Sequence, residues 1–333
     1  MDGLPLTERN GLPFASTVKA NVGGQETGVM HACGHDAHMA MLMATAKILT
    51  ENKSALKGMV KFLFQPAEEG VSADQSPAGA ELMVKEGVLE NPKVDAVFGL
   101  HIQSLLPSGT LNYRPGPLMA AVDGFDIRVK GIGAHGATPW EGVDPVVVAS
   151  QIVAGLQTIV SRQTELTEAA AVITVGSFHA GVRRNIIPEE AILQGTIRTF
   201  GAAMQKKVHE KIRLTATKIA EASGATADVD IQVMYPATIN DASLTEMMVP
   251  SLVKSAGREN VQVISAVTMA EDFSFFQQKV PGFFFFLGAY PAAAKPEKKP
   301  THHTVDFMID ENALPVGVKA LVNVTVDYLM KTK

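Results

Sequence analysis

The chain has 333 residues, of which 46% are apolar and 19% are charged, and its formal net charge is −5 with a pI of about 6.0. This composition is typical of a soluble α/β protein that is long enough for two domains. The acidic balance argues against a nucleic-acid-binding protein, which needs a basic face to neutralise phosphates.

The single cysteine, Cys33, excludes an internal disulfide and fits a reducing compartment. The first residues lack the basic start and apolar run of a signal peptide. No run of apolar residues approaches the length of about 20 that crosses a bilayer. We therefore expect a cytoplasmic protein with no membrane partner.

The first part of the chain alternates between two periodicities. Apolar residues at helical spacing predict helices over residues 39–49 and 78–86, and β-rich runs predict strands over residues 58–64 and 94–101. Strands that alternate with helices predict a mainly parallel sheet, whose ligands gather at the carboxyl ends of the strands. Glu69 follows the first of these strands, and His101 ends the second.

The pattern changes near residue 118 and changes back near residue 235. Between these points we expect helices over residues 144–162 and 203–222, and strands over residues 124–130, 171–178, 191–200 and 227–234. Two βαβ-like halves of this size predict a compact α+β, ferredoxin-like domain. Helices over residues 242–255 and 314–330 and a strand over residues 283–287 then complete the first domain. The predicted architecture is an α/β domain of residues 1–117 and 235–333, with residues 118–234 inserted as the smaller domain.

The densest polar cluster is His31-Ala32-Cys33-Gly34-His35-Asp36-Ala37-His38. Thiolate, imidazole and carboxylate ligands together suit borderline divalent ions such as Zn, Mn or Co, and Asp36 could orient an imidazole. The alternative is a set of polar residues that cap the following helix.

Glu68 and Glu69 are adjacent carboxylates at a strand exit, so one can bind metal while the other acts as general base. An isolated pair of this kind is more often a solvated acidic turn. His101, His302 and His303 are each, taken singly, more often hydrogen-bonded histidines than ligands. The convergence of these groups at the strand ends of one sheet favours a metal site that could hold two ions.

The sequence resembles the amidohydrolase branch of the M20 metallopeptidases, which includes aminoacylases, hippurate hydrolases, acetyl-diaminopimelate deacetylases and auxin-conjugate hydrolases. The resemblance runs through essentially the whole chain. Its motifs, in order, are HACGHDAH, FQPAEEG, FGLH, GAHGATP, LQTIVSR, NIIP, GTIRTF, MAEDFS and HHT.

The resemblance implies that the chain cleaves the amide bond of N-acyl amino acids with two divalent ions, Mn, Zn, Co or Ni. It implies that the smaller domain is a lid through which two chains form a homodimer. It also implies roles for nine residues. The metal ligands would be Cys33, which bridges the ions, with His35, Glu69, His101 and His303. Glu68 would be the general base, and His135 of the other subunit would hold the oxyanion. Asn185 and Arg198 would hold the substrate carboxylate.

Three features depart from the family pattern. The segment Met1-Asp2-Gly3-Leu4-Pro5 corresponds to the end of a longer RADMDALP-like segment, so we expect an amino end that is shortened. Asn185 is followed by Ile186 where the family usually has valine, and His303 is followed by Thr304-Val305 where many relatives have proline.

Two other functions fit part of the pattern. In a cysteine hydrolase, Cys33 would be the nucleophile and a histidine its base. That function leaves four residues without a role: Glu68, Glu69, His101 and His303. A chain with a shortened amino end could also be a non-catalytic relative that dimerises or binds a ligand.

Overall fold

The computed structural model describes residues 1–70, 76–291 and 299–331. It divides into two compact units. The larger unit consists of Met1–Leu118, Ile239–Ser265 and Asp272–Lys333, and the smaller consists of Met119–Thr238 and Ala266–Glu271. The mixed α/β architecture agrees with the predicted fold class.

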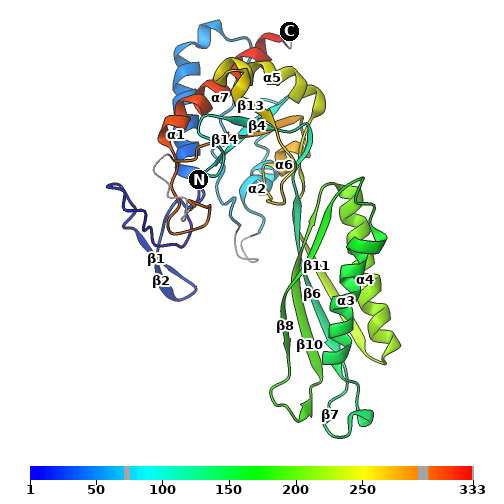
Figure 1. The fold of residues 1–333 in the computed structure, drawn as a ribbon. Helices are drawn as coiled ribbons and strands as arrows, with labels where there is room; N and C mark the ends of the chain where they lie inside the picture. Colours follow the sequence, from blue (N-terminus) through cyan, green and yellow to red (C-terminus); the bar gives the residue numbers. More distant parts are fainter. Residues whose placement is uncertain (71–75, 292–298, 332–333) are drawn as a thin grey trace. The chain divides into compact units, whose positions relative to one another are not determined.

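The larger unit is built on a four-stranded sheet (Figure 1). Its strands, in spatial order, are β13 (Val261–Val263), β4 (Leu111–Tyr113), β14 (Gly282–Gly288) and β3 (Val97–Gln103). The pairs β13–β4 and β14–β3 are parallel, and β14–β4 is antiparallel. Two of the three pairings therefore follow the parallel pattern that the alternation of helices and strands predicts.

Both faces of β14 are buried, which explains why its sequence is a continuous apolar run. Phe283 and Phe285 belong to the core under three helices, α1 (His35–Glu51), α5 (Ala242–Ala256) and α7 (Leu314–Lys331). Phe284 points to the other face and meets Phe273 with a ring separation of 4.9 Å. Phe273 leads into the short helix α6 (Ser274–Gln277), which packs against α2 (Gly79–Lys85).

The predicted strand over residues 58–64 is wrong, because no ladder forms there within the described residues. β propensity alone does not make a strand without a partner; Met59 is 73% exposed, and Lys61 uses its ammonium to bind the carbonyls of Val88, Glu90 and Pro92. Strand β3 also continues two residues beyond His101.

Besides β4 and β13, which the sequence did not predict, four further short strands were not expected. They form one hairpin and one further two-stranded sheet, with the bounds Lys19–Val22 (β1), Gln25–Gly28 (β2), Gly116–Met119 (β5) and Thr238–Asn240 (β12).

The smaller unit has the order β6 (Ala121–Lys130), α3 (Pro145–Gln163), β8 (Ala171–Ala180), β10 (Glu190–Thr199), α4 (Ala202–Ala222) and β11 (Thr226–Tyr235). The sheet order β11-β6-β10-β8, antiparallel throughout, is the ferredoxin-like arrangement. Helices α3 and α4 lie side by side on one face (Figure 1). A small pair, β7 (Ala134–His135) with β9 (Ile186–Ile187), extends from one end.

Two helices, Pro145–Gln163 and Glu311–Lys331, are long and apolar enough to cross a membrane by length and composition. Each contributes side chains to a packed core: Ile152 and Leu156 of the first lie under the sheet of the smaller unit, and Leu321 and Val324 of the second lie in the core of the larger unit. This packing is that of core helices in a globular protein.

Candidate metal centre

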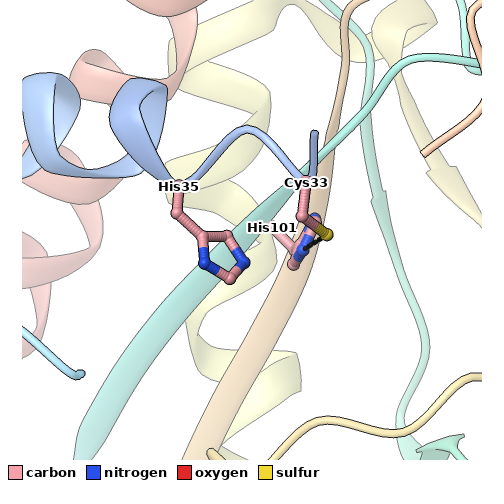
Figure 2. Close-up of side chains that lie close together, drawn as sticks. All are labelled: Cys33, His35 and His101. Atoms are coloured by element: carbon pink, nitrogen blue, oxygen red, sulfur yellow. Dashed lines mark hydrogen bonds between the residues drawn. The ribbon is translucent and has the colours of Figure 1, made fainter. Parts of the chain in front are cut away.

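The loop before α1 brings Cys33 and His35 to one place, and Gly34 between them makes this possible. Gly34 has φ 81°, which favours glycine, and a Cβ there would lie 2.5 Å from Cγ2 of Ile102. Without a side chain at this residue, Cys33 and His35 both reach the neighbourhood of His101 on β3 (Figure 2).

Three imidazoles surround the buried Cys33 sulfur. Its Sγ lies 3.4 Å from Nε2 of His101, 3.3 Å from Nε2 of His303 and 3.6 Å from Nδ1 of His302. The amide of His303 also donates to the carbonyl of Ala32 at 2.8 Å, which ties the two loops together. Segments separated by about 270 residues are therefore joined beside the thiol.

The hydrogen bonds of the imidazoles decide which nitrogens are free to bind metal. His101 donates from Nδ1 to its neighbour's carbonyl at 2.6 Å, so its Nε2 carries a lone pair toward Cys33. His302 accepts the amide of Ser104 at Nε2, so its proton sits on Nδ1, the atom that faces Cys33. His302 is therefore a hydrogen-bond donor to the sulfur, and His303 is the better candidate ligand.

The two carboxylates lie on the other side of His35. Nε2 of His35 is 3.7 Å from Glu68 and 4.0 Å from Glu69, and Nε2 of His303 is 3.0 Å from Oε1 of Glu69. Both carboxylates are largely buried, with side-chain exposures of 13% and 14%. An acidic turn open to solvent, which was the alternative interpretation, does not fit this burial.

The donor atoms fall into overlapping groups of three, each with all separations within 4.8 Å: Cys33, His35 and His101; Cys33, Glu69 and His303; and His35, Glu68 and Glu69. Metal–ligand bonds of about 2.0–2.3 Å in tetrahedral geometry place donors roughly 3.3–3.8 Å apart, which several of these pairs match. Among the described residues, the buried Nδ1 of His35 faces Asp2 at 3.4 Å, and the buried Oε1 of Glu69 faces Nε2 of His303 at 3.0 Å. This set of thiolate, imidazole and carboxylate donors, with Cys33 common to two of the groups, would suit divalent ions.

Burial keeps His38, His101 and His302, at or beside this cluster, in the neutral form. Burial, together with the nearby His302, lowers the pKa of His101 to about 3. Burial and the nearby His303 lower the pKa of His302 to about 4, and burial also lowers the pKa of His38. At neutral pH these rings do not have to lose a proton before a cation approaches.

Asp2, which is not one of the predicted site residues, lies against the cluster. Its Oδ1 is 3.4 Å from Nδ1 of His35, and its Oδ2 accepts the amide of Glu69 at 2.8 Å. Burial alone would raise the pKa of Asp2, but the His35 side chain and the Glu69 amide outweigh it and lower that pKa far below its usual range. Asp36 was expected to orient an imidazole, but it is exposed and accepts the amide of Ala37 instead. Asp2 takes the position expected for Asp36.

The three remaining predicted site residues lie on the smaller unit, at two different ends. His135 is on β7, Asn185 immediately precedes β9, and the carbonyl of Asn185 accepts the amide of Gly136 at 3.0 Å, so these two are neighbours. Arg198 lies near the far end of β10, opposite Val122. A ten-residue strand spans about 30 Å, so a single chain does not bring Arg198 to the other two.

The family model for peptidase family M20/M25/M40 matches residues 1–327. The chain belongs to this family. The match covers nearly the whole sequence, so both units of this M20 protein are parts of the family architecture.

Curated relatives of this M20 protein have named activities on amide bonds. It is 39% identical over 324 residues to thermostable carboxypeptidase 1 of Saccharolobus solfataricus, covering 96% of this chain and 77% of the relative. It is 37% identical over 335 residues to N-acetylcysteine deacetylase of Bacillus subtilis, covering 100% of this chain and 81% of the relative. A solved structure, the YXEP protein of Bacillus subtilis, is described as a dinuclear metal binding peptidase of the M20 family. It shares 35% identity with a TM-score of 0.78, over 99% of this chain and 79% of that one.

Membership of the M20 family does not favour the two other functions considered from the sequence. A cysteine hydrolase uses one base beside its thiol, whereas Cys33 in this M20 protein is shared by two groups of potential ligands that include His35 and Glu69. A non-catalytic relative would need no such convergence of buried metal-binding groups.

Proposed function

We propose that this M20-family hydrolase cleaves the amide bond of N-acyl amino acids at a centre of two divalent ions, Mn, Zn, Co or Ni. Five residues would hold the ions: Cys33, His35, Glu69, His101 and His303. The observation that carries the proposal is that two groups of three donors share the buried sulfur of Cys33. The named activity of the N-acetylcysteine deacetylase supports the substrate class.

When bound, the ions would supply Lewis-acid chemistry, which makes water more acidic and polarises the carbonyl of the amide. Glu68 would accept the proton of the attacking water and deliver it to the leaving nitrogen. Glu69 is the better ligand of the two carboxylates because it lies 3.0 Å from His303 and shares a group with Cys33. Glu68 is 3.7 Å from His35 and shares no group of donors with Cys33, which suits it to proton transfer.

The substrate carboxylate would be held by Asn185 and Arg198, and the oxyanion by His135. An arginine suits a carboxylate because its planar fork donates two hydrogen bonds. His135 and Asn185 lie about one strand length from Arg198, so one bound substrate could meet all three only if two chains contributed. The residues therefore favour a homodimer in which one chain completes the site of the other.

The inserted domain, residues 118–234, would be the lid and the dimerisation domain. Its strand β8 forms one edge of the sheet, with Val172 40% exposed and Phe178 39% exposed. An exposed edge strand with apolar side chains is a ready surface for pairing with a second copy. A single free cysteine, which forms no internal disulfide, supports a cytoplasmic location.

Metal analysis and a substrate panel test this proposal. The purified chain should carry about two ions and hydrolyse N-acetyl or N-benzoyl amino acids, and a chelator should abolish activity that Mn, Zn, Co or Ni restores. Glu68→Ala should keep the metal and lower kcat by about 100-fold or more. Glu81→Ala, an exchange on the surface of α2, is the matched control and should change neither. A folded chain with two ions and no hydrolysis of any panel member would refute the proposal.

A further inference from the structure

The MAEDFS motif contains a buried carboxylate, Asp272, that binds both the loop before Glu68 and the start of α2. Asp272 is 1% exposed, and both of its oxygens accept hydrogen bonds from other segments. One oxygen accepts from the side-chain amide of Gln65, and the other accepts the backbone amide of Ala80 at 2.7 Å. Asp272 thus joins the loop that carries Glu68 to the first turn of α2.

Gly79 shows how closely these segments meet. It has φ 55°, and a Cβ there would overlap Oδ2 of Asp272 and lie 3.1 Å from the carbonyl oxygen of Ala67. Only a glycine lets the start of α2 approach both the carboxylate and the loop.

The loop itself has a strained residue directly before the proposed base. Ala67 has φ 51°, a left-handed conformation that a non-glycine residue adopts only when its surroundings enforce it. The direction of the chain at Ala67 decides where the Glu68 side chain goes. The hydrogen bond from the Gln65 side chain to Asp272 lies two residues before Ala67 and can hold the loop in this conformation.

Asp272 is itself fixed to the strand that carries His101. The next residue, Phe273, packs so tightly on β3 that a Cβ at Gly99 would come within 2.8 Å of its ring. A carboxylate oxygen of Asp272 also lies within 4.8 Å of one of Glu68. Asp272 therefore links the loop of Glu68 to β3, the same strand that positions His101.

We propose that Asp272 is a positioning residue for the general base: by binding Gln65 and Ala80, it holds the Gln65–Glu69 loop so that Glu68 faces the metal centre. The inference rests on the proposed function, because it takes Glu68 as the base. It gives the aspartate of the MAEDFS motif a role in holding the loop that carries Glu68.

The test compares Asp272→Ala with Asp272→Asn. The alanine variant removes both bonds and should lower kcat by about tenfold or more while KM and the two ions per chain are kept, since a misplacement of about 1 Å can cost on the order of 100-fold. Asparagine still accepts the Ala80 amide and can donate to a rotated Gln65, so this variant should stay within about threefold of the parent kcat. Gln65→Ala leaves the start of α2 intact and should lower kcat in the same way. This variant carries the test if Asp272→Ala folds poorly.

The matched control is Asp241→Ala, which removes a carboxylate that accepts the Leu244 amide at the start of α5 and should leave kcat unchanged. The positioning role is refuted if Asp272→Ala and Gln65→Ala both keep the parent kcat, if Asp272→Asn falls as far as Asp272→Ala, or if Asp272→Ala loses an ion. Glu68→Ala, measured in parallel, separates the two ideas: a fully active Glu68→Ala overturns the proposed base, whereas an inactive Glu68→Ala beside an active Asp272→Ala overturns only the positioning role.

Discussion

The neutral histidines of the metal centre make the stability of the metal-free protein depend on pH. The pKa of His101 is about 3 and that of His302 is about 4, both below the value of about 6.5 in an unfolded chain. The unfolded state therefore binds protons that the folded state does not, and stability falls as the pH drops below about 6.5 toward 4. Between pH 7 and pH 5 each ring should cost about 2 kcal/mol of unfolding free energy, or about 4 kcal/mol together.

The assay is urea denaturation in the presence of a chelator at pH 7 and pH 5, on the parent chain and on His302→Gln. Glutamine can still accept the Ser104 amide but does not titrate in this range, so the variant should lose about 2 kcal/mol less than the parent between the two pH values. A variant whose loss equals that of the parent would refute the reasoning, because it would mean that burial does not keep His302 neutral.

Three further substitutions test parts of the site. Asp2→Ala should weaken metal affinity about 10- to 100-fold by releasing His35, measured by titration with a competing chelator. Gly34→Ala should lower the unfolding free energy by about 3 kcal/mol or more. The control Gly23→Ala, whose added Cβ meets nothing within 4 Å, should lower it by about 1 kcal/mol. Equal losses in thermal unfolding would contradict the close packing at Gly34. Arg198→Lys should raise KM about tenfold and change kcat less than threefold, because it weakens substrate binding; a loss confined to kcat would contradict that role.

The helices and the longer strands were predictable because each carries its own pattern. Helix α4 repeats apolar residues at helical spacing, and β14 is an uninterrupted apolar run with both faces buried. Strands β4 and β13 have three residues each, too few to show a period, and were missed. Residues 58–64 show the opposite error: their composition suits a strand, but a ladder needs a partner, and a partner is not a property of the segment itself.

Some residues of the site can be recognised in the local sequence, whereas others become visible only in the folded structure. The cluster around Cys33 and the Glu68–Glu69 pair are visible as chemistry within a few residues. His101 was a candidate because it ends a predicted strand, and the family resemblance selected His303 over His302. Asp2 could not be found from its surroundings, since its contacts with His35 and Glu69 join residues 33 and 67 positions away.

Two strained residues flank the proposed centre, and their positions suggest how it is held together. Ala67 precedes Glu68 with φ 51°, and His303 has φ 62°. A hydrogen bond to a distant segment lies at or beside each of these residues. Near Ala67, the Gln65 side chain donates to Asp272, and the amide of His303 donates to the carbonyl of Ala32. Strain of this kind persists only where the surrounding structure fixes it. The glycines, the buried Asp272 and the loop-to-loop amide bond therefore bring the donors together before any ion binds, so that binding need not meet the whole cost of ordering four separate segments.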